Sequence, residues 1–390
     1  MISRKMSASI QSGSMIRKMF EEGNRLKELY GPDNVYDFSI GNPDLEPPEE
    51  VRKTLCDLTA SPTQGMHGYM SNSGYLSTRT VVAASLSSDR LAVTPNAICM
   101  TVGAAGAMNA VLKAILDPGD EVILLSPFFM EYMNYVENHC GVPVVVPTQT
   151  DTFLPDLERI KVAIGPKTKA LIINSPNNPS GTVYPEDLLR SLNDLLLKQD
   201  HVIHIVSDEP YRELVYDGQT VPATMGLLSN LIICYSWSKS LSLPGERIGY
   251  SAVSPDHEDF DLLTQAIVLS NRILGSVNAP ALFQKVIEGS IGAKVDISSY
   301  ERRRDLLYRI VSDAGFSANK PAGAFYLFVR APEHDLAFAK KCAEQNLLVV
   351  PGSAFFCPGY FRLAFCVAEK VILASEKAFR AIGKSYGLIE

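Results

Sequence analysis

Between residues 97 and 235, short apolar runs alternate with stretches of helical periodicity, and this alternation constrains the fold more than any other feature. Runs that are apolar at nearly every position are typical of a parallel sheet whose two faces are covered by helices. Ligands of such sheets bind outside the carboxyl ends of the strands. We therefore expect an α/β domain with its site at that edge. The predicted strands cover residues 97–102, 121–125, 142–146, 170–174, 202–207 and 231–235.

The two ends of the chain have a different pattern. Near the N-terminus we expect an amphipathic helix that follows Gly13-Ser14 and ends at Gly31, and then a half-buried strand over residues 35–40. Residues 281–314 predict one long helix, and strands and a further helix follow it up to a last strand near residues 361–366. Because 390 residues are many for a single core, we interpret the tail as a smaller α+β domain.

The composition is that of an ordinary globular protein and disfavours several functional classes. A net charge of -7 gives no electrostatic basis for binding nucleic acid. The seven cysteines include no closely spaced pair and are interpreted as reduced thiols of a cytoplasmic protein. The N-terminus lacks the apolar core of a signal peptide, and no run reaches the roughly 18 apolar residues of a membrane span. We therefore expect neither secretion nor membrane insertion.

A lysine follows the last of these strands, where the apolar run 231–235 gives way to Ser236, Ser238 and Lys239. The ammonium group of lysine is strongly hydrated, so its placement at the mouth of a buried strand indicates an amine of lowered pKa, suited to Schiff-base chemistry. The two hydroxyls and Arg247, eight residues after the lysine, suit a phosphate held beside that amine. Taken alone, the stretch is equally compatible with a loop lysine near a surface arginine.

Small and aromatic residues follow the first two predicted strands. Ala104 and Ala105 open a helix, and their small side chains allow an anion to approach the free backbone N–H groups at the helix start. Tight packing of helix on strand also favours alanine there. Phe129 is a candidate for a planar lid over a heteroaromatic ring, although a single phenylalanine is more often part of a core.

Polar residues follow the next strands. Asn178 lies in a turn with two prolines, which fits either a hydrogen-bond donor aimed at a ligand or a simple turn. Asp208 comes directly after a buried strand, where a carboxylate is costly unless it is paired, and Tyr211 offers a phenol nearby. A helix cap is the alternative for Asp208. Arg362 in an apolar strand needs an anion, either a ligand carboxylate or an internal salt bridge.

Taken jointly, these residues make the chain resemble the class I/II aminotransferases of the pyridoxal-phosphate fold-type I superfamily, and most of all the bacterial aspartate-aminotransferase-like branch. The likeness extends from the segment 41–44 to the terminal strand. The matched positions, in chain order, are Asn178-Pro-Ser-Gly181, Asp208 with Tyr211, Ser236-Trp-Ser-Lys239, Arg247 and Arg362.

The resemblance implies a domain organisation and an assembly. Residues 46–280 would form a large, cofactor-binding domain around a mostly parallel seven-stranded sheet. Residues 1–45 would form an N-terminal arm and part of the small domain, and residues 281–390 the long connecting helix and the rest of the small domain. The family also implies a homodimer with its active sites at the subunit interface.

The resemblance assigns roles to the residues that bind the cofactor, pyridoxal 5′-phosphate. Lys239 would hold the cofactor as a Schiff base and move the proton, while Asp208 would pair with the pyridine nitrogen and keep it protonated. Tyr211 and Asn178 would bond the phenolic oxygen of the ring, and Phe129 would stack on its face. The cofactor's phosphate would lie among Ala104, Ala105, Ser236, Ser238 and Arg247, with Tyr69 reaching the phosphate of the partner subunit.

The same resemblance indicates which residues bind the substrate and where this chain differs from the family pattern. Gly41, Asn178 and Arg362 match positions that bind the substrate, with Gly41 and Arg362 at its α-carboxylate. Phe129 replaces the more common Trp or Tyr, and the phosphate loop has alanines in place of a hydroxyl, so we expect weaker cofactor retention. Arg272 lies near the position where some relatives place a second arginine from the neighbouring subunit; if the match holds, aspartate and glutamate are favoured. An exposed loop arginine is equally compatible.

The sequence therefore predicts a transaminase that moves an amino group between an L-amino acid and a 2-oxo acid in a ping-pong scheme. A β-eliminating C–S lyase uses the same scaffold and lysine and remains the alternative. A ligand-sensing module fused to a DNA-binding head is disfavoured, because the chain is acidic and shows no such head ahead of Ser14.

Overall fold

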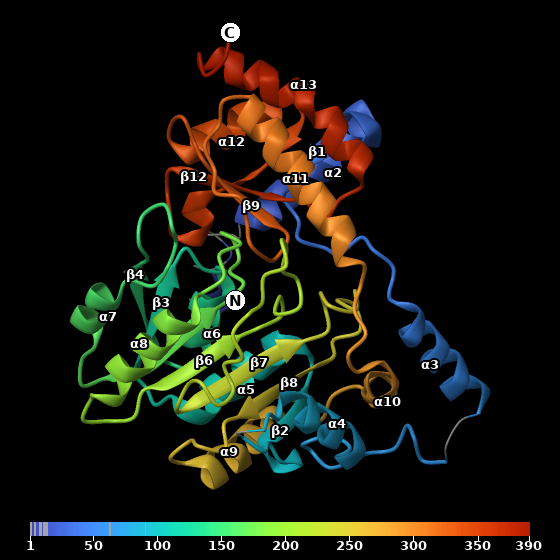
Figure 1. Cartoon of the computed structure of the whole chain (residues 1–390), viewed down its shortest axis with the longest axis vertical. Helices are drawn as coiled ribbons and strands as arrows, with labels where there is room; N and C mark the ends of the chain where they lie inside the picture. The colour runs from blue at the N-terminus through green and yellow to red at the C-terminus, as the bar shows by residue number, and fades with distance from the viewer. Residues whose placement is uncertain (1, 4, 8–9, 11–14, 62–63, 90) are drawn as a thin grey trace.

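The computed structural model describes residues 2–3, 5–7, 10, 15–61, 64–89 and 91–390 and, over residues 15–20, the backbone alone. Figure 1 shows a large domain around one sheet and a smaller domain above it, in which residues 15–37 lie beside the C-terminal elements. The helix α2 (Met15–Tyr30) confirms the expected amphipathic helix near the N-terminus. Gly13 and Ser14, which the sequence places ahead of it, lie outside the described residues.

The large domain contains a seven-stranded sheet with the order β2-β8-β7-β6-β5-β3-β4, in which only β8 is antiparallel to its neighbours. All six predicted strands are confirmed: β2 (Ile98–Thr101), β3 (Glu121–Ser126), β4 (Val142–Pro147), β5 (Thr168–Asn174), β6 (His204–Asp208) and β7 (Leu231–Ser236). The seventh, β8 (Gly249–Val253), was not among them, because its glycine, serine and alanine give a weak apolar signal.

Helices cover both faces of this sheet, as the continuous apolar strands predict. Along β3, Val122 and Leu124 face one side and Ile123 and Leu125 the other, and all four are buried. The first side packs against α5 (Gly103–Ile115), α6 (Glu131–Asn138) and α9 (Phe260–Ile273). The other packs against α3 (Glu49–Ala60), α4 (Leu76–Leu86), α7 (Leu157–Ala163), α8 (Glu186–Leu197) and α10 (Ala281–Ser290). The carboxyl ends of the parallel strands are thereby left as the place for a ligand.

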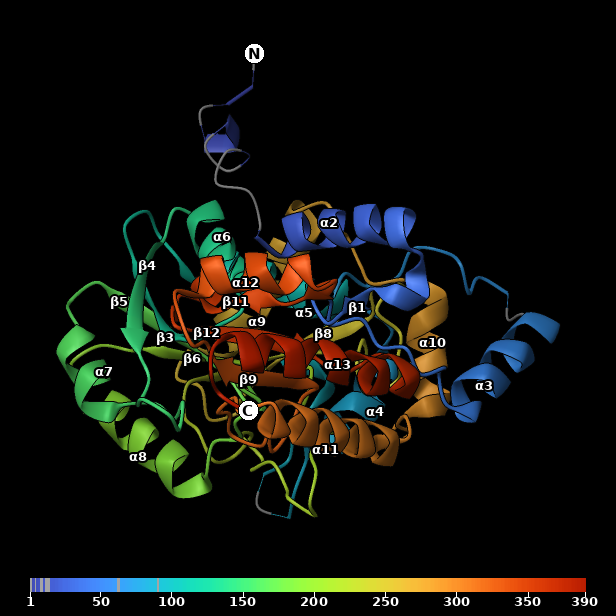
Figure 2. The same cartoon turned by 90° about the horizontal axis from the view of Figure 1, so that it is seen from above.

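The small domain is built from both ends of the chain. The antiparallel strands β11 (Val350–Pro351), β12 (Tyr360–Ala364) and β9 (Tyr326–Arg330) form its sheet, and β1 (Tyr36–Asp37) pairs in parallel with β10 (Leu347–Leu348). Seen from above in Figure 2, α11 (Ile297–Asp313) and α13 (Glu369–Ser385) lie over this sheet, with α12 (Asp335–Glu344) beside it. The pairing of β1 with β10 joins the N-terminal segment to the C-terminal core.

The expected single helix over residues 281–314 is wrong, because α10 ends at Ser290 and α11 begins at Ile297. Gly292 has a φ of 83°, which a helix interior does not allow. Asp296 then caps α11 by accepting a hydrogen bond from the backbone N–H of Ser298. The break separates α10, which packs in the large domain, from α11, which belongs to the small one. Within the described residues, every helix falls short of the length and apolar character needed to cross a membrane.

Candidate active site

A cavity of about 300 Å³ lies at the carboxyl ends of the central strands and is lined by residues of both domains. Neighbouring strands supply its floor, since Asn174 of β5 pairs with Asp208 of β6, which in turn pairs with Cys234 of β7. The cavity brings together twelve of the predicted site residues: Gly41, Ala104, Ala105, Phe129, Asn178, Asp208, Tyr211, Ser236, Ser238, Lys239, Arg247 and Arg362.

Lys239 lies just beyond β7, where the backbone turns away from the sheet. Its Nζ donates a hydrogen bond to the carbonyl oxygen of Gly41 at 3.0 Å and lies 5.2 Å from the centre of the Phe325 ring. Burial lowers the pKa of Lys239 to about 8, and the nearby cations Arg362 and Arg247 also lower it. About a tenth of this amine is therefore neutral, and thus nucleophilic, at pH 7, far more than for an ordinary lysine.

Asp208 is the last residue of β6. Its carboxylate is buried, and one of its two oxygens accepts a hydrogen bond. Tyr132 donates a hydrogen bond of 2.5 Å to Oδ2, whereas Oδ1 has no hydrogen-bond partner among the described residues. Burial raises the pKa of Asp208 to about 7, and the hydrogen bond from Tyr132 opposes this shift. A buried acceptor without a donor is costly, so the cavity fits a ligand that brings a cationic N–H to this oxygen.

The start of α5 has features that suit an anion. Val102 precedes the helix without a side-chain cap, so the first N–H groups of α5 have no partner from that residue. Gly103 has a φ of 76°, and a Cβ there would lie 2.8 Å from Nη2 of Arg247. Arg247 donates to the carbonyl oxygens of Pro244 and Val102, which carry no formal charge. The helix start and the guanidinium therefore converge on one place, and phosphate is the kind of anion they suit.

Arg362 is buried in β12 among aromatic rings. Its Nη1 donates to Oδ1 of Asn178 at 3.1 Å, and its Nη2 donates to the carbonyl oxygen of Ser39 at 2.7 Å. The guanidinium carbon lies 4.4 Å from the ring centre of Tyr326 and 4.8 Å from that of Phe355. Within the described part of the chain no carboxylate pairs with Arg362, so the internal salt bridge is excluded. Its Nε has no partner there either, which favours an external carboxylate.

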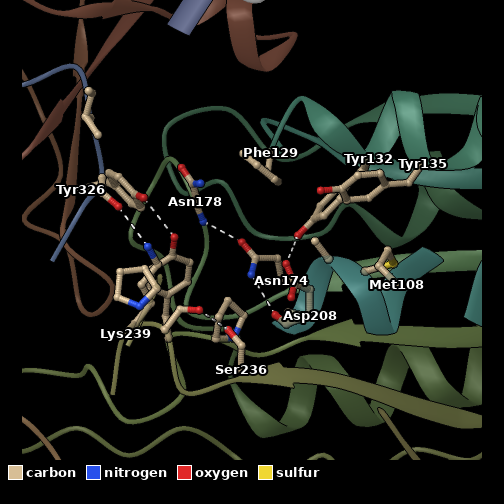
Figure 3. A pocket seen from close by; sticks show the side chains of 18 of the residues that line it. Met108, Phe129, Tyr132, Tyr135, Asn174, Asn178, Asp208, Ser236, Lys239 and Tyr326 are labelled. Atoms are coloured by element: carbon tan, nitrogen blue, oxygen red, sulfur yellow. Dashed lines mark hydrogen bonds between the residues drawn. The ribbon is translucent and has the colours of Figure 1, made fainter. Parts of the chain in front are cut away.

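Hydrogen bonds made by side chains fix the remaining polar groups. Asn174 accepts from the backbone N–H of Asn178 at 2.7 Å and donates to the carbonyl oxygen of Asp208 at 2.8 Å. The hydroxyls of Tyr211 and Tyr326 are 3.0 Å apart. Figure 3 shows Lys239 and Tyr326 toward one end of the cavity. These contacts hold the groups that surround the amine in fixed positions.

Among the lining residues that the sequence reasoning missed, three contact predicted site residues directly. Tyr132 bonds Asp208, Asn174 orients Asn178, and Tyr326 packs on Arg362. Asn174 carried a usable signal, since it is a polar residue at the end of an apolar strand. The two tyrosines carried none, because a tyrosine in an apolar segment is ordinarily a core residue.

Tyr69 and Arg272 do not line the cavity of their own chain. Tyr69 is 95% exposed, and Arg272 is exposed near the end of α9. Arg272 instead lines a separate depression between α9 and the loop 71–73. Both residues were expected to act on the neighbouring subunit, and those roles stay predictions.

Residues 33–374 match the model of the family "Aminotransferase class I and II". The chain belongs to this family. Aminotransferases of this family use pyridoxal 5′-phosphate to move an amino group between an amino acid and a 2-oxo acid. The predicted aminotransferase activity and the α/β fold of type I are thereby confirmed.

Named relatives of this aminotransferase cover most of its length. A probable aspartate/prephenate aminotransferase of Thermus aquaticus is 36% identical over 342 residues, which are 85% of this chain and 87% of the relative. The aspartate/prephenate aminotransferase of Thermus thermophilus is 33% identical, with 89% and 91% covered. Among solved structures, an aminotransferase from Eubacterium rectale is 40% identical with a TM-score of 0.95, over 99% of this chain and 100% of the other.

Replacing Asp208 with Asn in the cofactor-free aminotransferase should change how stability depends on pH. The native pKa of about 7 exceeds the ordinary value of 3.8, so between these pH values the folded protein holds a proton that the unfolded chain releases. Wild-type stability should fall as pH rises through this window, by up to about 4 kcal/mol at about 1.4 kcal/mol per pKa unit. Asp208→Asn should remove that slope, as measured by urea denaturation between pH 4 and pH 8.

Asp217→Asn is the matched control, because the hydrogen bond from Arg304 lowers the pKa of Asp217. The pH dependence of stability then has the opposite sign from that of Asp208. Asp217 stabilises the folded protein above its unfolded pKa, and this contribution is lost as the pH falls through the lowered folded pKa. The control should therefore keep the wild-type slope between pH 5 and pH 7. An Asp208→Asn slope equal to that of wild type would contradict the burial of an ionisable carboxylate.

Proposed function

We propose that this aminotransferase binds pyridoxal 5′-phosphate in the described cavity and uses Lys239 as its catalytic amine. The observation that carries the proposal is that Oδ1 of Asp208, which has no partner among the described residues, lies in the same cavity as a buried lysine. A protonated pyridine nitrogen supplies the cationic N–H that this oxygen lacks, and a charge-assisted bond of this kind contributes roughly 1.5–3 kcal/mol. The residues present therefore fit the cofactor of the family.

The other cavity residues would hold the remaining parts of the cofactor. The start of α5 at Ala104 and Ala105, together with Arg247, would bind the phosphate, with hydroxyls from Ser236 and Ser238, which lie 3.1 Å apart. Phe129 would cover the ring, and Tyr211 and Asn178 would donate to its phenolic oxygen. When bound, the cofactor supplies an electron sink for the charge left on the substrate Cα after deprotonation.

The chain's own groups would position the substrate and move its proton. Arg362 would bind the α-carboxylate, and its fixed hydrogen bonds to Asn178 and Ser39 would set the direction of the amino acid. A Cβ at Gly41 would overlap the hydroxyl of Tyr326, so glycine is required for this close packing. Lys239 would take the proton from Cα as a neutral base, which its lowered pKa allows.

We also propose that two copies of the chain form a homodimer. Leu262, Leu269 and Ile273 of α9 are exposed at helical spacing, and the loop next to α9 leads to the fully exposed Tyr69. Exposed apolar side chains gathered on one surface are typical of an interface. In a dimer, Tyr69 would reach the phosphate in the partner's cavity, as the family resemblance implies.

The thiols support a cytoplasmic location, which is likewise a proposal. All seven cysteines are free, and burial raises the pKa of Cys99 and of Cys366 to about 12, so that both stay protonated. Proteins of the cytoplasm keep their cysteines reduced.

Lys239→Ala should abolish transamination and the covalent attachment of cofactor that borohydride makes permanent. In the wild-type protein freed of cofactor, the rate of attachment should rise with pH and level off above about pH 8, since burial lowers the pKa of the amine to about 8. Stopped-flow absorbance and mass spectrometry measure these two quantities. Lys377→Ala, at an exposed lysine of α13, is the control and should behave as wild type. Attachment that survives in Lys239→Ala would refute the assignment.

An experiment with the cofactor-loaded wild-type protein distinguishes transamination from elimination. Without a 2-oxo acid, an amino acid should convert one equivalent of cofactor per site and the reaction should then stop. Continuous release of pyruvate and ammonia would instead indicate lyase chemistry.

Tyr69→Phe should weaken cofactor binding about ten-fold, because it removes one charge-assisted hydrogen bond to the phosphate, worth about 1.4 kcal/mol or more. Equilibrium dialysis measures the affinity, and sedimentation should show a dimer for both proteins. Tyr30→Phe, at an exposed tyrosine of α2, is the matched control with unchanged affinity. A monomeric wild-type protein, or unchanged affinity in Tyr69→Phe, would contradict the shared site.

A further inference from the structure

We propose that this aminotransferase prefers L-amino acids with uncharged side chains over aspartate and glutamate. The inference rests on the proposed positions of cofactor and substrate, and it concerns the space left for the substrate side chain. It is carried by the charges that line the cavity and by the hydrogen bonds in which its polar groups already take part.

Every cation of the cavity already has a role. Among the described residues that line it, the cations are Lys239, Arg247 and Arg362. Lys239 is the amine that reacts, Arg247 lies against the start of α5 where the phosphate binds, and Arg362 faces the α-carboxylate. A dicarboxylic substrate brings a second carboxylate, and no fourth cation of the described lining remains to pair with it.

The inner part of the cavity, around Lys239, Asp208 and Arg362, is buried and gives such a charge little access to water, whereas the Arg247 end is exposed. Lys239, Asp208 and Arg362 all have pKa values displaced by burial, which shows how poorly charges are solvated here. An unpaired carboxylate in this space would lose its hydration without compensation. The negative charge of Asp208, once ionised, would repel it as well. The electrostatics of the cavity therefore disfavour a charged side chain.

The uncharged polar groups of the lining are largely engaged. The amide oxygen of Asn178 accepts from Arg362, the amide group of Asn174 donates to Asp208, and the hydroxyls of Tyr211 and Tyr326 bond each other. The lining also includes Ile40, Gly41 and the ring of Tyr326, which packs on the guanidinium of Arg362. Such a wall offers apolar contact, which suits an aliphatic or aromatic side chain.

This preference would separate the chain from relatives whose names specify aspartate. The opposing hypothesis is that Arg272 of the partner subunit supplies the missing cation. In its own chain, Arg272 is exposed and lines the depression beside the loop 71–73. The test must therefore compare substrates that differ in charge and also remove this arginine.

Cofactor-loaded protein is mixed with single amino acids, and conversion of the cofactor absorbance gives kcat/KM for the half-reaction. Aspartate with asparagine and glutamate with glutamine are matched pairs that differ in charge and hardly in shape, and leucine and alanine complete the set. We expect asparagine to exceed aspartate, and glutamine to exceed glutamate, by at least ten-fold, with leucine the most reactive. Aspartate that equals or exceeds asparagine overturns the inference.

Binding without turnover gives a second readout. Spectral titration with 4-methylpentanoate, which has one carboxylate, should give a Kd at least ten-fold lower than titration with succinate, which has two. Tighter binding of succinate overturns the inference. A preference for aspartate that disappears in Arg272→Ala overturns it as well, and assigns the fourth cation to the partner subunit.

The outcomes also separate this inference from the proposed function. If no amino acid, alanine included, converts the cofactor, the proposed function fails and the inference falls with it. If aspartate converts the cofactor and asparagine does not, the proposed function stands and only the inference fails.

Discussion

At the end of β6, a carboxylate is buried with only one of its two oxygens hydrogen-bonded, and the rest of the site is arranged around it. Tyr132 satisfies Oδ2 of Asp208, while Oδ1 has no donor in the described part of the chain. A group of this kind reduces stability unless a ligand pairs with it. The parallel sheet fixes its place, because Asn174 and Cys234 hold Asp208 in register from both sides.

The cations around this carboxylate are kept apart by the fold, and each is thereby available for a different charge. Lys239 follows β7, the strand next to β6, Arg247 lies against the start of α5, and Arg362 comes from the small domain. Burial lowers the pKa of Lys239 and of Arg362, while aromatic rings and carbonyl oxygens surround them. Both domains thus contribute residues to one cavity.

Much of this arrangement is predictable from the sequence, because charged residues at the ends of apolar runs are costly without a function. Asp208 and Lys239 both stand at such ends, which made them candidates, and only the joint pattern with Asn178, Arg247 and Arg362 favoured a site over a helix cap or a loop lysine. Prediction fails where signals are weak or arise only on folding. The strand β8 was not predicted, because its small residues give a weak apolar signal. Gly292 ends a helix that the apolar periodicity of the sequence predicts to continue. Tyr132 and Tyr326 become site residues only when folding brings them to Asp208 and Arg362.

The central claim is that Asp208 requires a cationic partner, and the ionisation of its side chain tests this most directly. Carbon-13 NMR of protein labelled at the aspartate carboxyl carbons, with Asp208→Asn to assign the signal, gives its pKa with and without cofactor. We predict titration near pH 7 in the cofactor-free protein, as burial dictates, and an ionised carboxylate down to at least about pH 5 once a protonated ring nitrogen is bound. A pKa that is the same in both forms would contradict the account.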